Sequence, residues 1–285
     1  MTATPPVPPL TWLYVPASRP DQVEKAIASR AHVVIVDLED AVAPGGKEDA
    51  RKVLAERFGE PLEKLVHVRV NPLSTPFGRA DLEVVAELQG VAGLHLPKVS
   101  SPDDVCAVAE LLPSRRFRLH CLIESAAGLE AAFAIASSPD VAGLSLGEAD
   151  LAGEIGAFGV GLDWARSRTI NAACAAGLPR PPQAVYPHVR DDEGFTRLCA
   201  HGRELGHLGG GAIHPGQLGI IEEAYLPSSR EVAEARESLE LFERLGSQLV
   251  GAFALADGGL VDAAVARSAR QTVAIAERYG TRDDR

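Results

Sequence analysis

Two carboxylates, Glu124 and Asp150, are the residues of this sequence that are best placed to do chemistry. Each lies where a short apolar run meets a turn that is rich in Gly or Ala. The two segments are Leu122-Ile-Glu-Ser-Ala-Ala-Gly128 and Leu146-Gly-Glu-Ala-Asp-Leu151. A carboxylate at the carboxyl end of a parallel strand faces the crevice in which α/β proteins bind ligands. Two such groups on neighbouring strands, with water in the remaining positions, suit a hard divalent cation such as Mg2+. The alternative interpretation is that both residues only cap helices.

Charged residues at the ends of other apolar runs add to this site. The three carboxylates Asp37, Glu39 and Asp40, in Val36-Asp-Leu-Glu-Asp-Ala41, are candidates for an outer shell that orients metal-bound water, or else for a helix cap with solvated acids. Arg69 ends another run, and its forked donors suit a substrate carboxylate or an enolate oxygen, or else a structural ion pair. Arg19 is a comparable candidate for binding an anion.

Other catalytic classes find less support. Lys98 is a candidate Schiff-base lysine in principle, but metal-based and imine-based electron sinks are seldom needed together. The eight histidines form no His-x-x-x-His cluster, so a zinc site is not expected. His214 is interpreted as a packed histidine at a strand end.

Short apolar runs recur along the chain and alternate with segments of helical periodicity. Runs without polar alternation indicate strands that are covered on both faces, as in parallel sheets. Eight strands that alternate with helices predict a (β/α)8 TIM barrel. A doubly wound open sheet is the competitor, which is disfavoured because no glycine-rich nucleotide loop follows the early strands. The eight runs are Trp12–Ala17, Val33–Leu38, Leu65–Val70, Gly93–Val99, Phe117–Ile123, Ala142–Gly147, Ala184–Pro187 and Gly211–His214.

The character of the sequence changes near Pro227. Residues 1–226 are predicted to form the TIM-barrel catalytic domain. Residues 227–285 then carry an amphipathic helix with a Ser cap, a hairpin-like or extended piece over Leu249–Asp262, and a last helix to about Tyr279. We expect this part to be a helical extension that acts as a lid on the active site of its own or a neighbouring subunit.

Composition narrows the class of protein. The chain has 285 residues, of which 46% are hydrophobic and 24% charged, as in ordinary globular proteins. Its net charge of −11 argues against nucleic-acid binding, which needs clustered Lys and Arg. The four cysteines form no Cys-x-x-Cys pair, which indicates free thiols in a reducing compartment. With a Pro-rich start and no apolar stretch of about 18–20 residues, we expect neither a signal peptide nor a membrane span, and a cytoplasmic location.

The ordered set of runs resembles the citrate lyase β subunit and malyl-CoA lyase family, the HpcH/HpaI-type aldolases. Any one piece is weak, but together they extend from about residue 12 to 265 in order. The matching pieces are Tyr14-Val-Pro-Ala-Ser-Arg-Pro, Val36-Asp-Leu-Glu-Asp-Ala-Val-Ala-Pro, Arg69-Val-Asn, Leu96-Pro-Lys-Val, Leu122-Ile-Glu-Ser-Ala-Ala-Gly, Leu146-Gly-Glu-Ala-Asp-Leu, Ile213-His-Pro-Gly-Gln and Gly251-Ala-Phe-Ala-Leu-Ala-Asp-Gly-Gly-Leu-Val-Asp.

The resemblance implies a barrel enzyme with one metal site. Glu124 and Asp150 match the family's Mg2+ ligands, and Glu124 also belongs to the substrate-binding set. Arg69 matches the arginine that contacts substrate and metal-bound oxygens. Glu39 and Asp40 match the acidic pair near the metal.

The resemblance also assigns residues outside the metal site. Asp262 matches an aspartate that the C-terminal segment delivers to the active site, often that of a neighbouring subunit. Arg19 and Lys47 lie where basic residues of the family meet CoA phosphates. A homotrimer or hexamer is implied. The sequence departs from the family at Ala17, where Gly is usual, and at Leu146, where Phe is frequent, so the substrate remains open.

The implied reaction is Mg2+-dependent cleavage, or formation, of a carboxylated 3-hydroxyacyl-CoA. Its products are an acyl-CoA and a 2-oxo acid such as glyoxylate, pyruvate or oxaloacetate. In this scheme Arg69 stabilises negative oxygen and Asp262 moves the proton at the enolate carbon. Two alternatives remain: a CoA-independent metal aldolase for a small hydroxy-oxo acid, and a lyase subunit that acts on carrier-bound thioesters.

Overall fold

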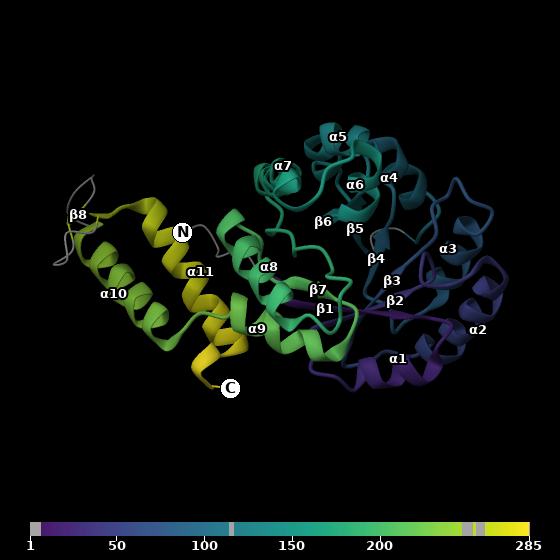
Figure 1. Ribbon diagram of the computed structural model, residues 1–285, viewed down its shortest axis with the longest axis horizontal. Helices are drawn as coiled ribbons and strands as arrows, with labels where there is room; N and C mark the ends of the chain where they lie inside the picture. The colour runs from purple at the N-terminus through teal and green to yellow at the C-terminus, as the bar shows by residue number, and fades with distance from the viewer. Residues whose placement is uncertain (1–6, 114–116, 247–252, 255–259, 285) are drawn as a thin grey trace. The chain divides into compact units, whose positions relative to one another are not determined.

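The computed structural model describes residues 7–113, 117–246, 253–254 and 260–284 (Figure 1). The chain divides into two compact units. The first is Pro9–Ile221, and the second combines Met1–Pro8 with Glu222–Arg285. The division therefore lies inside helix α9 (Leu218–Tyr225). None of the helices in the described residues combines the length and hydropathy needed to cross a membrane.

The first unit is built on a parallel sheet of seven strands, in the order β6-β5-β4-β3-β2-β1-β7. Every residue of β2 and of β4 is buried, as expected for strands covered on both faces. The sheet curls into a half-barrel, which is consistent with a TIM-barrel-like fold. The strands are β1 (Thr11–Pro16), β2 (Val33–Asp37), β3 (Leu65–Arg69), β4 (Gly93–Leu96), β5 (Arg118–Ile123), β6 (Val141–Leu146) and β7 (Gly210–Ala212).

The prediction of a closed eight-stranded barrel is wrong at one point. The run Ala184–Pro187 forms no strand, and Gln183 makes only an isolated parallel bridge with Gly210 of β7. In the part of the chain that the structure describes, no strand pairing joins this segment to β6. Proline has no N–H for a strand ladder, and Pro181, Pro182 and Pro187 surround Gln183. The sheet therefore stays open between β6 and residues 183–187.

Helices connect the strands, and α1 to α5 form an arc around the outside of the sheet (Figure 1). The predicted start of α4 is confirmed: Ser101 is the N-cap, its hydroxyl accepts from the Asp104 amide, and Pro102 opens the helix. The helices are α1 (Pro20–Ile27), α2 (Lys47–Phe58), α3 (Gly78–Glu87), α4 (Pro102–Ala109), α5 (Ala126–Ala136), α6 (Glu148–Ile155), α7 (Asp163–Ala175) and α8 (Asp192–Leu205), with short 3-10 turns at Pro44–Gly46, Gly159–Leu162 and Pro215–Gln217.

A tryptophan and three histidines fill the inside of the half-barrel. His67, His95 and His120 come from β3, β4 and β5, and the rings of His95 and His120 stack at 5.0 Å with an interplanar angle of 8°. Trp12 of β1 meets each of the three rings edge-on, at 5.3–5.7 Å between ring centroids. Burial lowers the pKa of all three imidazoles, that of His120 to about 4. The cluster is therefore neutral at pH 7.

This cluster predicts a loss of stability in mild acid. An unfolded histidine binds a proton below about pH 6.5, whereas folded His120 stays neutral until about pH 4, so acid favours the unfolded chain. For His120 alone the free energy of unfolding is expected to fall by about 3 kcal/mol across that window. Denaturant unfolding of the wild type at pH 7, 5.5 and 4.5 should show this fall. His120→Asn should reduce the slope with pH by about 1 kcal/mol per unit, whereas His188→Gln, an exposed control, should not. Equal slopes in all three proteins would contradict the assignment.

The second unit is a helical hairpin. Helices α10 (Ser229–Gly246) and α11 (Ala263–Tyr279) pack against each other, and a short 3-10 turn covers Arg282–Asp284. Both predicted helices are confirmed. The predicted extended piece contributes the antiparallel strands β8 (Phe253–Ala254) and β9 (Leu260–Val261), and its other residues before Asp262 lie outside the described part.

Candidate active site

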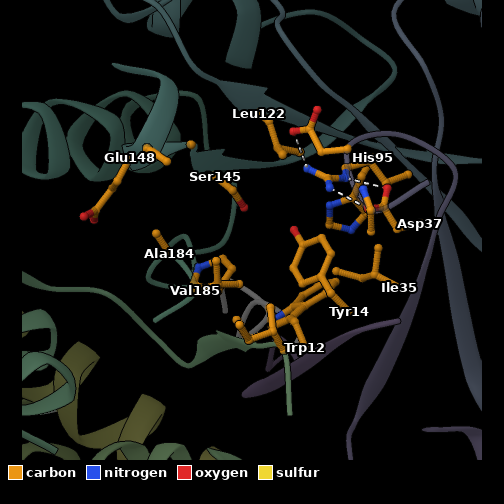
Figure 2. A pocket seen from close by; sticks show the side chains of 18 of the residues that line it. Trp12, Tyr14, Ile35, Asp37, His95, Leu122, Ser145, Glu148, Ala184 and Val185 are labelled. Carbon is orange, nitrogen blue, oxygen red and sulfur yellow. Dashed lines mark hydrogen bonds and ion pairs between the residues drawn. The ribbon is translucent and has the colours of Figure 1, made fainter. Parts of the chain in front are cut away.

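A pocket of about 390 Å3 opens at the carboxyl ends of the strands of the first unit (Figure 2). Its walls come from β1 to β6, from Gly211 of β7, from the start of α6, and from residues 182–185 and Pro187. The segment that failed to form a strand thus lines the pocket instead. Glu124, Asp150, Arg69 and Asp40 all line it, so the structure brings these four predicted residues together.

Strand register fixes the centre of the charged wall. Asp37 at the end of β2 lies directly beside Arg69 at the end of β3. Arg69 donates from Nε to Asp37 Oδ1 at 2.8 Å and from Nη2 to Oδ2 at 2.6 Å, a bidentate ion pair. Burial by itself would lower the pKa of Arg69, but Asp37 outweighs it and raises that pKa, so the guanidinium stays charged. Asp37 is itself buried, and its two oxygens also accept the amides of Glu39 and Ala41.

The predicted acidic pair joins this network. The buried Glu39 lies 3.1 Å from Arg69 Nη1 and 2.6 Å from Lys98 Nζ. Asp40 is more exposed and lies 3.8 Å from Arg69 and 3.7 Å from Lys98. Burial would lower the pKa of Lys98, yet the hydrogen bond from its ammonium to Glu39 prevails and raises it. A protonated, ion-paired Lys98 is not activated for imine formation, which agrees with the doubt that the sequence raised.

Glu124 is a buried carboxyl group at the end of β5, with a relative exposure of 6%. Its Oε2 accepts the Lys98 amide at 2.8 Å, and Lys98 adopts a left-handed φ of 57° at that point. Gly147 makes room for Glu124, since a Cβ there would collide with the Glu124 side chain. Burial is the main cause that raises the pKa of Glu124 to about 7, and the charges of Glu39 and Asp150 add to it. An ionised Glu124 therefore gains from a nearby cation.

Asp150 lies in the first turn of α6 and is exposed towards solvent. The start of α6 is anchored by Arg166 of α7, which donates to Glu148 at 2.8 and 2.5 Å and also to Asp163 at 2.7 Å. Glu124 and Asp150 supply carboxylate oxygens, the donors that Mg2+ prefers. Within the described residues no group of three or more His, Cys, Asp or Glu is arranged to hold a metal. Two carboxylates leave the other positions of a six-coordinate cation to water or substrate.

Lys47 does not occupy the position expected for a CoA contact. It is buried, and its ammonium donates to the Leu38 carbonyl at 2.7 Å, the Glu39 carbonyl at 2.7 Å and Asn71 Oδ1 at 2.8 Å. An ammonium group has three N–H donors, so none is left for a phosphate. The structure therefore corrects the assignment of Lys47, which holds the loop that carries Glu39.

Arg19 does not line the pocket, and Asp262 belongs to the other compact unit. Arg19 is exposed at the start of α1 and is not among the residues that line the pocket. Asp262 belongs to the second unit, where it is the N-cap of α11 and accepts the amides of Ala264 and Val265 at 2.8 and 2.9 Å. Its delivery to an active site remains a proposal.

Asp37 and Tyr14 are pocket residues whose roles the sequence did not reveal. Asp37 was visible as one acid among several, but its pairing with Arg69 depends on the register of β2 and β3. Strand β1 carries two hydroxyl groups, those of Thr11 and Tyr14, and Thr11 is fully buried. Its position near the end of the first strand was the available signal.

The first unit is thus a parallel half-barrel with acidic residues and a bidentate arginine at its carboxyl end, the face at which TIM-barrel enzymes carry their active sites. The family model described as HpcH/HpaI aldolase/citrate lyase matches residues 10–215. The chain belongs to this family, whose characterised relatives include carbon–carbon lyases.

Individual relatives are similar along nearly the whole chain. The (3S)-malyl-CoA thioesterase of Cereibacter sphaeroides strain KD131 is 37% identical over 277 residues, and the L-malyl-CoA/beta-methylmalyl-CoA lyase of Rhodobacter capsulatus is 34% identical over 302 residues. Each alignment covers 93% of both proteins. The structure of CitE from Mycobacterium tuberculosis in complex with magnesium, acetoacetate and coenzyme A has a TM-score of 0.76 and 32% identity, and it covers 94% of this chain and 98% of that chain.

Proposed function

We propose that this protein is a Mg2+-dependent carbon–carbon lyase for a carboxylated 3-hydroxyacyl-CoA, which it cleaves to, or forms from, an acyl-CoA and a 2-oxo acid. The observation that carries the proposal is the pair Glu124 and Asp150, which share one pocket with Arg69. The complex of the M. tuberculosis protein with magnesium, acetoacetate and coenzyme A supports it. A homotrimer or hexamer is part of the proposal, and analytical ultracentrifugation tests it.

Glu124 and Asp150 would hold the cation. When bound, Mg2+ supplies a Lewis acid that polarises the oxygens of the oxo acid. Arg69 has five N–H donors, of which Asp37 and Glu39 engage three, so two remain for a substrate oxygen. Because Asp37 holds the guanidinium plane from one side, Arg69 presents those donors in a fixed orientation.

Asp262 would move the proton at the carbon next to the thioester. This residue also caps α11, and two variants separate the roles. Asp262→Asn keeps an oxygen that can accept the cap amides, whereas Asp262→Ala loses it and should cost about 1 kcal/mol of stability. We expect both variants to lose about 10²- to 10⁴-fold in kcat, and only the alanine variant to lower Tm. Steady-state assays and thermal unfolding check this. Full turnover of Asp262→Asn would show that the residue is only a cap.

Hydrolysis of the thioester is the second candidate function, because the four relatives at 36–37% identity are named (3S)-malyl-CoA thioesterases. A lyase releases acyl-CoA and a 2-oxo acid, whereas a thioesterase releases free CoA and the intact hydroxy acid. The products therefore distinguish the two activities.

The deciding experiment incubates the protein with malyl-CoA, citramalyl-CoA and citryl-CoA, with Mg2+ and with EDTA, and identifies the products by mass spectrometry. Acyl-CoA and 2-oxo acid, formed only with Mg2+, are expected. Free CoA with the hydroxy acid would favour the thioesterase. Activity only on the CoA-free hydroxy-oxo acid would favour the metal aldolase, and activity only with acyl carrier protein thioesters would favour a subunit of a larger lyase.

A further inference from the structure

The hydroxyl group of Tyr14 is an unused hydrogen-bonding group in the wall of the pocket. Tyr14 lies on β1 and lines the pocket, and Figure 2 shows its hydroxyl turned towards the interior. Within the described residues this hydroxyl has no hydrogen-bond partner. A polar group at such a position is free to bind a ligand without first breaking a bond within the protein.

The ring of Tyr14 is held firmly although its hydroxyl is not. The guanidinium carbon of Arg69 lies over the ring at 5.5 Å from its centroid, and the His95 ring meets it edge-on at 6.2 Å. The ring also packs on the core cluster of Trp12, Val33 and Ile35. These contacts fix the direction in which the hydroxyl points.

The surroundings make Tyr14 a donor and not a base. Burial raises its pKa to about 12, the positive charge of Arg69 lowers it in part, and the carboxylates of Asp37, Glu124 and Glu39 raise it further. The phenol therefore keeps its proton at the pH at which enzymes of this kind work. Three of the five N–H donors of Arg69 bind carboxylates of the protein, so a further donor in the pocket adds to the hydrogen bonds that a substrate can receive.

We propose that Tyr14 is a catalytic residue, whose hydroxyl donates a hydrogen bond to the thioester oxygen of the substrate as that oxygen becomes an enolate. This role rests on the proposed function. In cleavage, the electron pair of the breaking carbon–carbon bond moves into the acyl-CoA fragment and places negative charge on its thioester oxygen. The substrate hydroxyl releases its proton to water as it becomes the carbonyl of the 2-oxo acid, the enolate carbon takes up one proton through Asp262, and Tyr14 keeps its own. No oxidant or reductant is needed.

The topology of the sheet assigns Tyr14 to the thioester fragment. Glu124 at the end of β5 and Asp150 after β6 are the cation ligands proposed to hold the oxo-acid fragment. Tyr14 is on β1, and strands β2, β3 and β4 lie between β1 and β5 in the sheet. The hydroxyl thus approaches the substrate from another part of the rim, as the second fragment requires.

The test compares Tyr14→Phe with Tyr186→Phe. The control loses the same hydroxyl from a residue that is not part of the pocket lining and that donates to Asp191 at 2.5 Å. For Tyr14→Phe we expect kcat to fall about 10²-fold, as for other single donors to a developing oxyanion, with KM changed less than about threefold. Its Tm should match the wild type, because the lost hydroxyl has no protein partner in the described residues. The control should keep the wild-type kcat.

A second readout follows enolate formation without bond cleavage. Acetyl-CoA is incubated with the protein, Mg2+ and a 2-oxo acid in D2O, and mass spectrometry measures exchange of the acetyl protons. Tyr14→Phe should slow this exchange by the same factor as kcat. Unchanged kcat and exchange in Tyr14→Phe, or a rise in KM alone, would overturn the role of Tyr14. A wild type that neither cleaves a hydroxyacyl-CoA nor exchanges protons would instead overturn the proposed function.

Discussion

Glu124→Gln and Asp150→Asn are each expected to lower Mg2+-dependent cleavage by about 10³-fold or more, since a cation that polarises a substrate oxygen contributes several kcal/mol. Each substitution removes one of the two carboxylates of the proposed metal site and changes the shape of the side chain little. The fold should survive. Burial raises the pKa of Glu124 to about 7, so its ionised form is costly and a neutral Gln is tolerated there. Its amide oxygen can still accept the Lys98 amide.

Three measurements belong to this prediction: turnover, Mg2+ affinity by calorimetry, and Tm. Glu154→Gln is the matched control, because Glu154 lies on the same helix as Asp150 but its Oε2 accepts the Ala126 amide, outside the pocket lining. The control should bind Mg2+ as the wild type does. Wild-type turnover with either Glu124→Gln or Asp150→Asn would remove the metal site, and with it the lyase proposal.

Arg69→Met is expected to affect stability and activity together. The variant leaves the buried Asp37 without the charge that compensates it, while Glu39 keeps its ion pair with Lys98, and loss of one partner from a buried ion pair costs about 3–5 kcal/mol. The two N–H donors assigned to substrate disappear as well, so turnover should fall by at least about 10²-fold. Denaturant unfolding and steady-state assays measure the two effects separately.

A double variant separates the two consequences of losing Arg69. Arg69→Met with Asp37→Asn removes the uncompensated charge and should recover part of the stability, but none of the activity. Arg69→Lys keeps the charge but cannot form the bidentate pair, so it should be stable and still slow. If the double variant regained wild-type turnover, Arg69 would be a structural partner of Asp37 and nothing more.

Much of the architecture was predictable because its signals are local. Apolar runs placed seven of the eight predicted strands to within a few residues, and the cap at Ser101 placed α4. Local signals failed at Ala184–Pro187, where the run resembles a strand but the prolines around it remove ladder donors. Pairing with neighbours on both sides decides whether such a run becomes a strand, and a short run does not contain that information.

The candidate site was likewise predictable from the sequence only in part. That Glu124 and Asp150 would share one pocket followed from their positions at the ends of successive strands. Lys47 has a charge that suits a phosphate, yet its burial and its three acceptors became visible only in the folded chain. The histidine cluster was also hidden, because His67, His95 and His120 are far apart in sequence and meet through strand order alone.

The amino-acid sequence by itself determined the family, the parallel α/β character and the acids that line the pocket, because residue type and short-range spacing encode these properties. Tertiary structure decided which charges are paired, namely Asp37 with Arg69 and Glu39 with Lys98. It also left the Tyr14 hydroxyl without a partner within the described residues. Such pairing depends on register and burial, since the energy of a charge is set by neighbours that the chain brings together only on folding.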